Sequence, residues 1–343
     1  MRKPWSPGLF SKRLATRLAI LYNTHMDPFY QSQLSFLLAL QNIGGLTGLM
    51  EFFTFLGREQ FFLLLLPFIY LCLDPAAGAR LVLILVCGDA INGFLKLAFH
   101  LPRPYWIDSR VQALSTETSY GLPSGHAQTG ASIWFFIASA VRRPWGWAAA
   151  AVIVGLISLS RLYLGVHFPS DIVGGWIVGG VFLFAYLKIE PGAKVWLSQL
   201  DLGRQIAVAF IASLALALVG VAIRAALNGI SDPEPWAALA ADARSLAGTF
   251  AGAGSVCGIG IGLALANRWA RFSAGGPLVK RVARFVIGLF CVGLVYFGLR
   301  AFFPGEPEVV ALPLRYLRYA LVTFTAIFIV PWSLLKLRLA EPK

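Results

Sequence analysis

The segment SRLYLGVHFPSD, residues 160–171, places an arginine, a histidine and an aspartate between two long apolar stretches. The chain has only four histidines, so a histidine here suggests a function. Pro169 suits the first turn of a helix, and Asp171 follows His167 by four residues. A helix that begins near Pro169 would return the Asp171 carboxylate to the imidazole, fixing its tautomer and stabilising an imidazolium. This spacing predicts His167 as a nucleophile.

Two further polar segments lie upstream, KLAFHLPRP at residues 96–104 and GLPSGHAQ at residues 121–128. In the transition state of phosphoryl transfer, negative charge spreads over three equatorial oxygens, and positioned cations stabilise it. Arginine can hold two oxygens with its planar guanidinium, whereas lysine acts as a point charge. We therefore interpret Lys96, Arg103 and Arg161 as phosphate-binding cations.

The sequence PSGH at residues 123–126 is suited to anion binding at the start of a helix. Gly125 lets the main chain approach an anion closely, and Ser124 adds a hydroxyl donor. His126 can protonate the leaving oxygen, because an imidazole with an ordinary pKa of about 6.5 serves as acid or base at neutral pH. No cluster of carboxylates suits magnesium or a two-metal site, so neither a metal nor another cofactor is expected.

Together the three segments resemble the signature of the type-2 phosphatidic acid phosphatase superfamily, K-x6-R-P, P-S-G-H and S-R-x5-H-x3-D. Between residues 96 and 171 no position departs from it: Lys96, Arg103, Pro104, Pro123, Ser124, Gly125, His126, Ser160, Arg161, His167 and Asp171. The resemblance implies a metal-independent phosphatase that forms a phosphohistidine at His167. It also implies that Asp171 is the partner of this histidine and that His126 is the general acid.

Segments outside the signature are similar to two branches of this family. Residues 55–81 and 119–128 resemble sphingosine-1-phosphate phosphatases, whereas residues 88–106 and a four-span C-terminal extension resemble the glucose-6-phosphatase branch. The favoured substrate is a lipid phosphate or diphosphate monoester of isoprenoid, sphingoid or phosphatidic acid type, because its head must meet a site at the membrane face. A glucose-6-phosphatase-like sugar phosphatase is the alternative.

Two other functions share the cationic site. Vanadate-dependent haloperoxidases of the same superfamily are typically soluble, which conflicts with the many apolar segments. A phospholipid- or phosphate-binding transporter is a candidate of a different class, and transporters often show paired internal repeats and broken helices. Neither feature is visible in the sequence, so an enzyme is favoured.

The composition places these segments in a membrane. The chain of 343 residues is 58% hydrophobic and 13% charged, about half the charged fraction of an average soluble domain. The net charge of +13 gathers at the ends of apolar segments, which is typical of loops beside a bilayer and argues against nucleic-acid binding. All four cysteines fall inside apolar runs, where packing explains them.

Nine apolar runs predict transmembrane helices near 57–73, 80–99, 127–141, 146–160, 171–187, 205–227, 246–266, 282–302 and 316–335. Residues 29–50 contain several glutamines and are interpreted as interfacial. The segment around Phe10 to Leu21 predicts an amphipathic helix on the membrane surface. Pairs of glycines four residues apart predict close helix packing at Gly175 and Gly179, at Gly248 and Gly252, and at Gly258 and Gly262.

The predicted fold is all-α, a polytopic membrane helix bundle of about nine transmembrane helices. A catalytic core of five to six helices at residues 51–190 follows the interfacial segment at 1–50, and residues 191–343 form a C-terminal extension. With nine spans, the loops after spans two and four lie on one membrane face, so the polar segments can meet. In span two, Asp89 and Asn92 share a face with Lys96 and are expected to join a polar contact between helices.

Most other basic residues fall in loops on the opposite face. The positive-inside rule then predicts an integral membrane protein of the bacterial inner membrane whose site faces the extracytoplasmic side.

Overall fold

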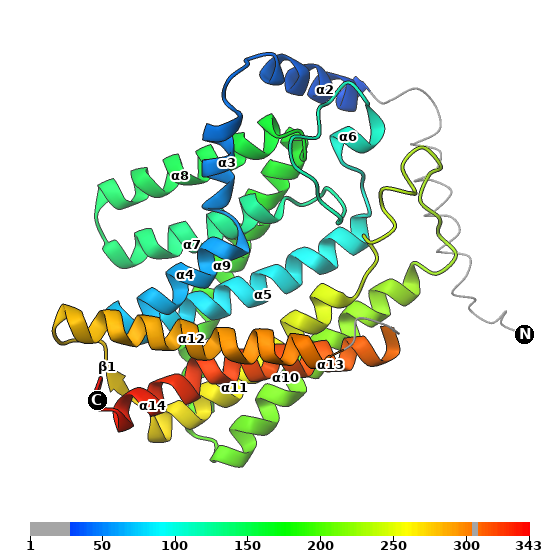
Figure 1. Cartoon of the computed structure of the whole chain (residues 1–343). Helices are drawn as coiled ribbons and strands as arrows, with labels where there is room; N and C mark the ends of the chain where they lie inside the picture. Colours follow the sequence, from blue (N-terminus) through cyan, green and yellow to red (C-terminus); the bar gives the residue numbers. More distant parts are fainter. Residues whose placement is uncertain (1–27, 304–307) are drawn as a thin grey trace, which may run out of the picture.

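The computed structural model describes residues 28–303 and 308–343, and its regular structure there is almost entirely helical (Figure 1). The all-α prediction is confirmed, apart from a two-stranded antiparallel pair that joins Phe272 to Pro342. The predicted surface helix around Phe10 lies outside the described residues. In chain order the elements are α2 (Pro28–Gln41), α3 (Thr47–Phe55), α4 (Glu59–Phe68), a π-helical turn η1 (Ile69–Leu73), α5 (Pro75–Phe99), α6 (Pro104–Ile107), α7 (Gly125–Val141), α8 (Pro144–Tyr163), α9 (Pro169–Ser198), α10 (Leu202–Ala226), α11 (Ala247–Trp269), β1 (Phe272–Ser273), α12 (Leu278–Phe302), α13 (Glu308–Phe324), a second π-helical turn η2 (Thr325–Ile329), α14 (Val330–Lys336) and β2 (Glu341–Pro342).

Local sequence explains where several of the helices begin. Asp74 caps α5 by accepting from the amides of Ala76 and Ala77, and Asp201 caps α10 in the same way. Helices α5, α8 and α9 each have proline at the first position, where a missing N–H costs no hydrogen bond. Helix α7 begins directly after Ser124, as the PSGH sequence predicts.

Within residues 28–303 and 308–343, seven helices are long and apolar enough to cross a membrane, or eight if α3 and the α4–η1 segment form one span bent by 46°. Helix α7, which matches the third predicted span, has 17 residues and is not among them. The predicted number of about nine is reached only when both α7 and the bent pair are counted. The bent pair begins at Thr47, earlier than the predicted start at residue 57, so the end of the segment interpreted as interfacial belongs to a candidate span.

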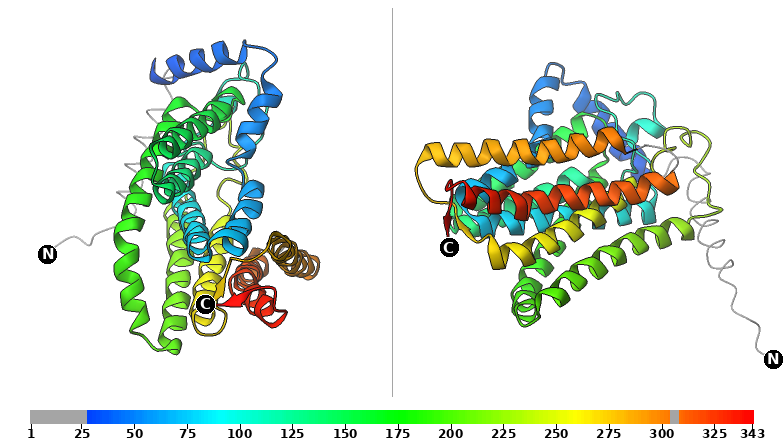
Figure 2. Two further views of the ribbon diagram at one scale, coloured as in Figure 1. Left: turned by 90° about the vertical axis from the view of Figure 1, so that its left-hand side faces the viewer. Right: turned by 60° about the horizontal axis from the view of Figure 1, so that its bottom comes forward.

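Helix α5 lies between two groups of helices (Figures 1 and 2). On one side it contacts α4, α7 and α9, with Leu81, Ile84, Ile133, Phe136 and Leu183 in a shared apolar cluster. On the other side it contacts α10 and α11 of the C-terminal extension. One helix therefore supports both the predicted catalytic core and the extension.

Small residues allow close approach where α9 crosses α7. A Cβ atom on Gly175 would lie 2.6 Å from the Ser124 carbonyl oxygen, and one on Gly179 would lie 2.5 Å from that of Gln128. The predicted packing role of these glycines is thus confirmed. In α11 the tightest approaches, to the main chain of α13, are at Gly254 and Gly258. A Cβ on Gly248 or Gly252 would meet no such crowding, so the prediction is wrong for these two.

Helix α2 packs on the loop after α6 and on the loop before α9 through an apolar cluster of Leu34, Leu37, Val111 and Phe168. Two of its glutamines add hydrogen bonds. Gln33 accepts from the amide of Ser170 at 2.9 Å, and Gln41 donates to and accepts from the main chain of Gln112. The glutamines that suggested an interfacial segment therefore fix α2 onto the loops that surround the predicted site.

Candidate active site

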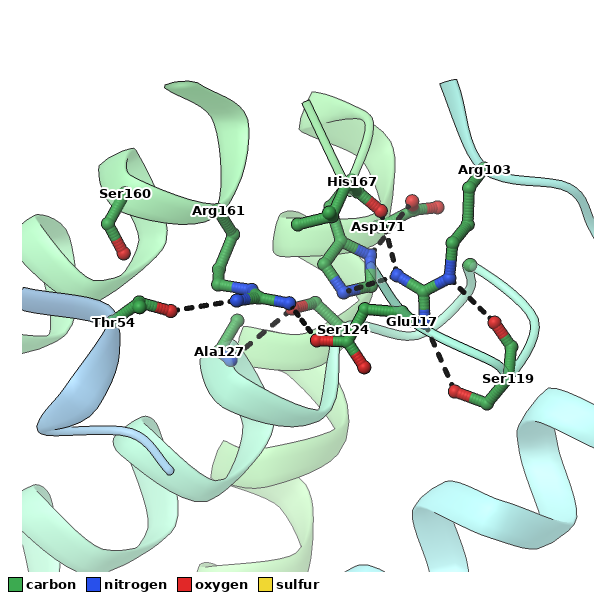
Figure 3. Close-up of polar contacts among 12 residues, drawn as sticks. Thr54, Arg103, Glu117, Ser119, Ser124, Ala127, Ser160, Arg161, His167 and Asp171 are labelled. Carbon is green, nitrogen blue, oxygen red and sulfur yellow. Dashed lines mark hydrogen bonds and ion pairs between the residues drawn. The ribbon is translucent and has the colours of Figure 1, made fainter. Parts of the chain in front are cut away.

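The three predicted polar segments converge at one end of the helices (Figure 3). The loop after α5 supplies Arg103, the start of α7 supplies Ser124, and the junction of α8 and α9 supplies Arg161, His167 and Asp171. The Arg103, Arg161, His167 and Asp171 side chains are almost fully buried. The residues singled out by spacing therefore lie together in the fold.

His167 and Asp171 meet as the helix start at Pro169 predicts. Nδ1 of His167 lies 3.2 Å from Oδ2 of Asp171, and the same oxygen accepts from the amide of Phe168 at 2.9 Å. The carboxylate thus caps the first turn of α9 and holds the imidazole at the same time. Two donors on one carboxylate oxygen leave the ring little freedom to rotate.

Arg103 surrounds the other side of this histidine. Its Nη1 donates to the Val166 carbonyl at 2.8 Å and lies 3.3 Å from Nε2 of His167. Nε donates to the Ser119 carbonyl at 2.6 Å, and Nη2 donates to the Ser119 hydroxyl and the Tyr120 carbonyl. A guanidinium has five N–H donors and no acceptor. All five donors of Arg103 are therefore engaged in this conformation.

Lys96, near the end of α5, points its ammonium at the loop before α7. Nζ donates to the Tyr120 carbonyl and, at 3.3 Å, to the Gly121 carbonyl. An ammonium has three donors, so one remains for a ligand. The predicted phosphate-binding role of Lys96 is consistent with this geometry and stays a prediction.

Arg161 bridges two elements that are distant in sequence. Nη1 donates to Oγ1 of Thr54 in α3 at 2.8 Å, and Nη2 forms an ion pair with Oε1 of Glu117. The Nε atom is buried and has no partner in the described part of the chain. The Glu117 carboxylate thus accepts from a guanidinium group that was predicted to bind phosphate.

Sequence reasoning missed both Glu117 and Thr54. The sequence did contain a signal for Glu117, because it is an acidic residue in the loop just before PSGH, and three cations were predicted at the same site. Burial raises the pKa of its carboxyl, but the charges of Arg161, Arg103 and Lys96 outweigh burial and hold this pKa below its usual value. The glutamate is therefore an anion at neutral pH.

The PSGH segment forms the start of α7. The Ser124 hydroxyl accepts from the Ala127 amide, and the Ser124 amide donates to the Asp171 carbonyl at 3.0 Å. A Cβ on Gly125 would lie 3.2 Å from Oδ1 of Asn92. The main chain is therefore held close to α5 and α9, with the positive end of the α7 dipole at the site.

Asn92 carries much of this support. Its Nδ2 donates to the Pro123 carbonyl at 3.2 Å and to Oε1 of Gln128 at 2.9 Å. Asp89, one turn earlier, accepts from the Thr129 hydroxyl at 3.4 Å. Both side chains join polar contacts between α5 and α7, as predicted from their shared face with Lys96.

His126 lies beside the break between α3 and α4, where a Cβ on Gly57 would be 3.0 Å from its Cδ2 atom. Its Nε2 is buried and has no hydrogen-bond partner among the described residues. The imidazole interacts electrostatically with Arg161, Arg103 and Lys96. This ring nitrogen is thus free to exchange a proton with a ligand held by the cations.

Burial lowers the pKa of His167, and the charges of Arg103, Lys96 and Arg161 lower it further. The imidazole is therefore neutral at neutral pH. Because Arg103 can only donate, Nε2 of His167 is the acceptor and Nδ1 carries the proton toward Asp171. Within the described residues, no three His, Cys, Asp or Glu side chains lie close enough together to hold a metal ion.

Comparisons with known proteins match two segments of the chain to one family. Residues 77–194 match the model described as the PAP2 superfamily, and residues 250–342 match the model described as PAP2 superfamily phosphatase, transmembrane extension. All of the predicted site residues, from Lys96 to Asp171, fall within the first match.

Three curated relatives differ in how much of the chain they share. An undecaprenyl-diphosphatase from Sulfolobus acidocaldarius is 30% identical over 167 residues, 46% of this chain and 78% of that protein. Mouse sphingosine-1-phosphate phosphatase 2 is 34% identical over 146 residues, 39% of this chain and 40% of that protein. The catalytic subunit 1 of mouse glucose-6-phosphatase is 26% identical over 315 residues, 80% of this chain and 86% of that protein.

Proposed function

Because the chain belongs to the PAP2 superfamily, we propose that it is an integral membrane phosphatase that hydrolyses a lipid phosphate or diphosphate monoester through a phosphohistidine at His167. One observation carries the proposal. Nδ1 of His167 faces the Asp171 carboxylate, so the free electron pair of the imidazole lies on Nε2, which faces Arg103. A neutral imidazole in this tautomer is ready to attack phosphorus.

The first step transfers the phosphoryl group to the enzyme. Nε2 of His167 attacks phosphorus, and the bond between phosphorus and the leaving oxygen breaks. The anionic phosphate offsets the cations around His126, so this imidazole holds a proton in the complex and gives it to the leaving oxygen. Lys96, Arg103 and Arg161 stabilise the charge on the equatorial oxygens. Asp171 accepts the hydrogen bond from Nδ1–H and stabilises the positive charge that the phosphorylated ring acquires.

The second step releases phosphate. His126, now neutral, takes a proton from a water molecule while the water oxygen attacks phosphorus. The bond between nitrogen and phosphorus breaks, and its electron pair returns to Nε2 of His167. Inorganic phosphate leaves, and both histidines return to their starting protonation states. With a diphosphate, the leaving group of the first step is the lipid monophosphate.

The position of the site supports a lipid substrate. The site lies at the ends of apolar helices, where a polar head at the membrane face reaches the cations while its chain stays in the bilayer. The relatives named as undecaprenyl-diphosphatase and sphingosine-1-phosphate phosphatase are consistent with this class.

A sugar phosphate is the second candidate, and the extension is the observation that favours it. The similarity to the glucose-6-phosphatase subunit continues through the extension and covers 80% of this chain, whereas the other two relatives cover less than half of it.

Phosphate release from the purified protein tests the function. The panel contains an isoprenyl diphosphate, a sphingoid base phosphate, phosphatidic acid and glucose 6-phosphate, each with wild type and His167→Ala. We expect fastest release from one of the lipids and no release by the variant. Fastest release from glucose 6-phosphate would support the sugar candidate. Transport of a phosphate compound that survives His167→Ala, without hydrolysis, would support a transporter instead.

The site is proposed to face the extracytoplasmic side of a bacterial inner membrane. Apart from the three cations of the site, basic residues are concentrated in loops at the opposite end of the helices. Examples are Arg142, Arg143, Arg268, Arg271 and Lys280. Positive loops are retained in the cytoplasm, so the site would lie outside it.

A further inference from the structure

The loop between α10 and α11, residues 227–246, contacts the loop before α7. Tyr120 of that second loop accepts hydrogen bonds from Lys96 and Arg103. Tyr120 is fully buried, and its hydroxyl donates to Asp232 at 3.0 Å and accepts from Nε of Arg244 at 2.9 Å. Nη1 of Arg244 donates in turn to the Ile230 carbonyl at 2.6 Å. The phenol is therefore held by two charged side chains of the C-terminal extension.

Aromatic packing surrounds this contact. Trp236 of the same loop stacks on Trp106 with ring centroids 5.7 Å apart, and it forms a T-shaped pair with the Tyr120 ring. Both tryptophans and the tyrosine are buried in one cluster, which also includes Leu97, the neighbour of Lys96. Burial raises the pKa of Tyr120 to about 12, so its hydroxyl keeps the proton that it donates to Asp232.

The main chain of the same tyrosine faces the site. Its carbonyl oxygen accepts from Nζ of Lys96 and, at 3.2 Å, from Nη2 of Arg103. These two cations repel each other, and a carbonyl dipole shared between them reduces that repulsion. The main chain of Tyr120 is thus the contact that Lys96 and Arg103 share.

We propose that Arg244 and Asp232 are positioning residues of the phosphate site, which act through Tyr120 on Lys96 and Arg103. The loop at 227–246 gives the extension a role in binding the substrate's phosphate, although it supplies no cation that contacts the phosphate. The inference rests on the proposed function, because it takes the site to bind a phosphoryl group.

Affinity for an anion tests the inference without turnover. Orthovanadate and inorganic phosphate are titrated into full-length protein in detergent, with Arg244→Ala, Arg244→Lys and Tyr120→Phe. Tyr120→Phe removes one oxygen atom and keeps the ring in its cluster. We expect Arg244→Ala and Tyr120→Phe to weaken both anions by about three- to tenfold, the effect of one lost buried hydrogen bond. Arg244→Lys keeps the charge, so its affinity for both anions should lie between that of these two variants and that of wild type.

Arg284→Ala is the matched control. Arg284 is equally an extension arginine that holds main-chain carbonyls, those of Ser273, Ala274 and Gly275, but beside β1 at the other end of the bundle (Figures 1 and 2). It should lower Tm and leave anion affinity within about twofold of wild type.

Wild-type affinity in both Arg244→Ala and Tyr120→Phe would overturn the inference, as would an equal loss in Arg284→Ala. A wild type that binds vanadate but hydrolyses no phosphate ester would instead refute the proposed function and leave the positioning role measurable.

Discussion

Nη1 of Arg103 lies 3.3 Å from Nε2 of His167, so an arginine donor covers the atom proposed as nucleophile. The contact fixes the tautomer, because an arginine can only donate. It also means that an incoming phosphoryl group must take over this donor before nitrogen can reach phosphorus. Arg103 would then turn from the imidazole to a phosphate oxygen by a small rotation.

Labelled phosphate should be trapped on His167. Acid quenching destroys phosphohistidine, so rapid mixing with labelled substrate is followed by alkaline denaturation and mass analysis. We expect label on wild type and none on His167→Ala. His100→Ala is the control, since the only hydrogen bond found for the His100 side chain in the described structure is to the Ala98 carbonyl. Label that persists in His167→Ala would show that the nucleophile is elsewhere.

Loss of His126 should depend on the leaving group. A phenolate with a low pKa leaves without a proton, whereas an alkoxide needs one. His126→Ala should therefore reduce kcat by about 10²–10⁴ on an alkyl phosphate and by much less on an aryl phosphate with an acidic phenol. Equal losses on both would exclude His126 as the acid.

Glu117→Gln should strengthen phosphate binding. The wild-type carboxylate is paired with Arg161 and competes with an anionic ligand for the same donors. A neutral amide of the same shape competes less, so we expect the inhibition constant of inorganic phosphate to fall by about three- to tenfold. Asp108→Asn, which changes a carboxylate paired with Arg110 in the same loop, should have no effect. Weaker binding in Glu117→Gln would show that the glutamate mainly orients Arg161.

His167 should remain neutral in mildly acidic solution. Burial and three nearby cations lower its pKa, so the ring gains a proton only after the pH has fallen below about 6.5. Carbon-13 NMR of labelled histidine, assigned with His167→Ala, should give a midpoint below that value. Lys96→Met removes one positive charge and should raise the midpoint, while Arg110→Gln should not. A midpoint at or above 6.5 in wild type would contradict the proposed electrostatics.

Accessibility of single cysteines should report the orientation. Ser109→Cys lies in the exposed loop after α6, near the site, and Ser333→Cys lies in α14 at the opposite end. In a background without Cys72, Cys87, Cys257 and Cys291, an impermeant thiol reagent on intact cells should label the first and spare the second. The reverse pattern would place the site in the cytoplasm.

The sequence was most informative where the chemistry restricts residue type. His167 and Asp171 lie four residues apart at the start of α9, so their contact could be predicted from spacing and from Pro169. The contribution of Tyr120 could not, because its main-chain carbonyl is the group that contacts Lys96 and Arg103. Any residue type can supply a carbonyl, so no side-chain pattern indicates it.

Contacts across long sequence separations were also beyond prediction. Thr54 and Glu117 reach Arg161 only because α3 packs against α8 and the loop before α7 turns inward. The predicted start of the first span, at residue 57, was too late for a related reason, since α3 and α4 meet at a bend that hydropathy alone does not locate. Periodicity gives the helices, whereas tertiary packing decides which of them meet.

The break between α3 and α4 lies within a candidate membrane span and beside two residues of the candidate site. Thr54, just before it, accepts from Arg161, and a Cβ on Gly57, within it, would lie 3.0 Å from Cδ2 of His126. A change in the 46° angle between the two segments would alter the surroundings of both Arg161 and His126, the proposed phosphate-binding cation and the proposed general acid. Because membrane thickness and lateral pressure act on the tilt of a span, turnover by this protein should respond to the mechanical state of the membrane around it.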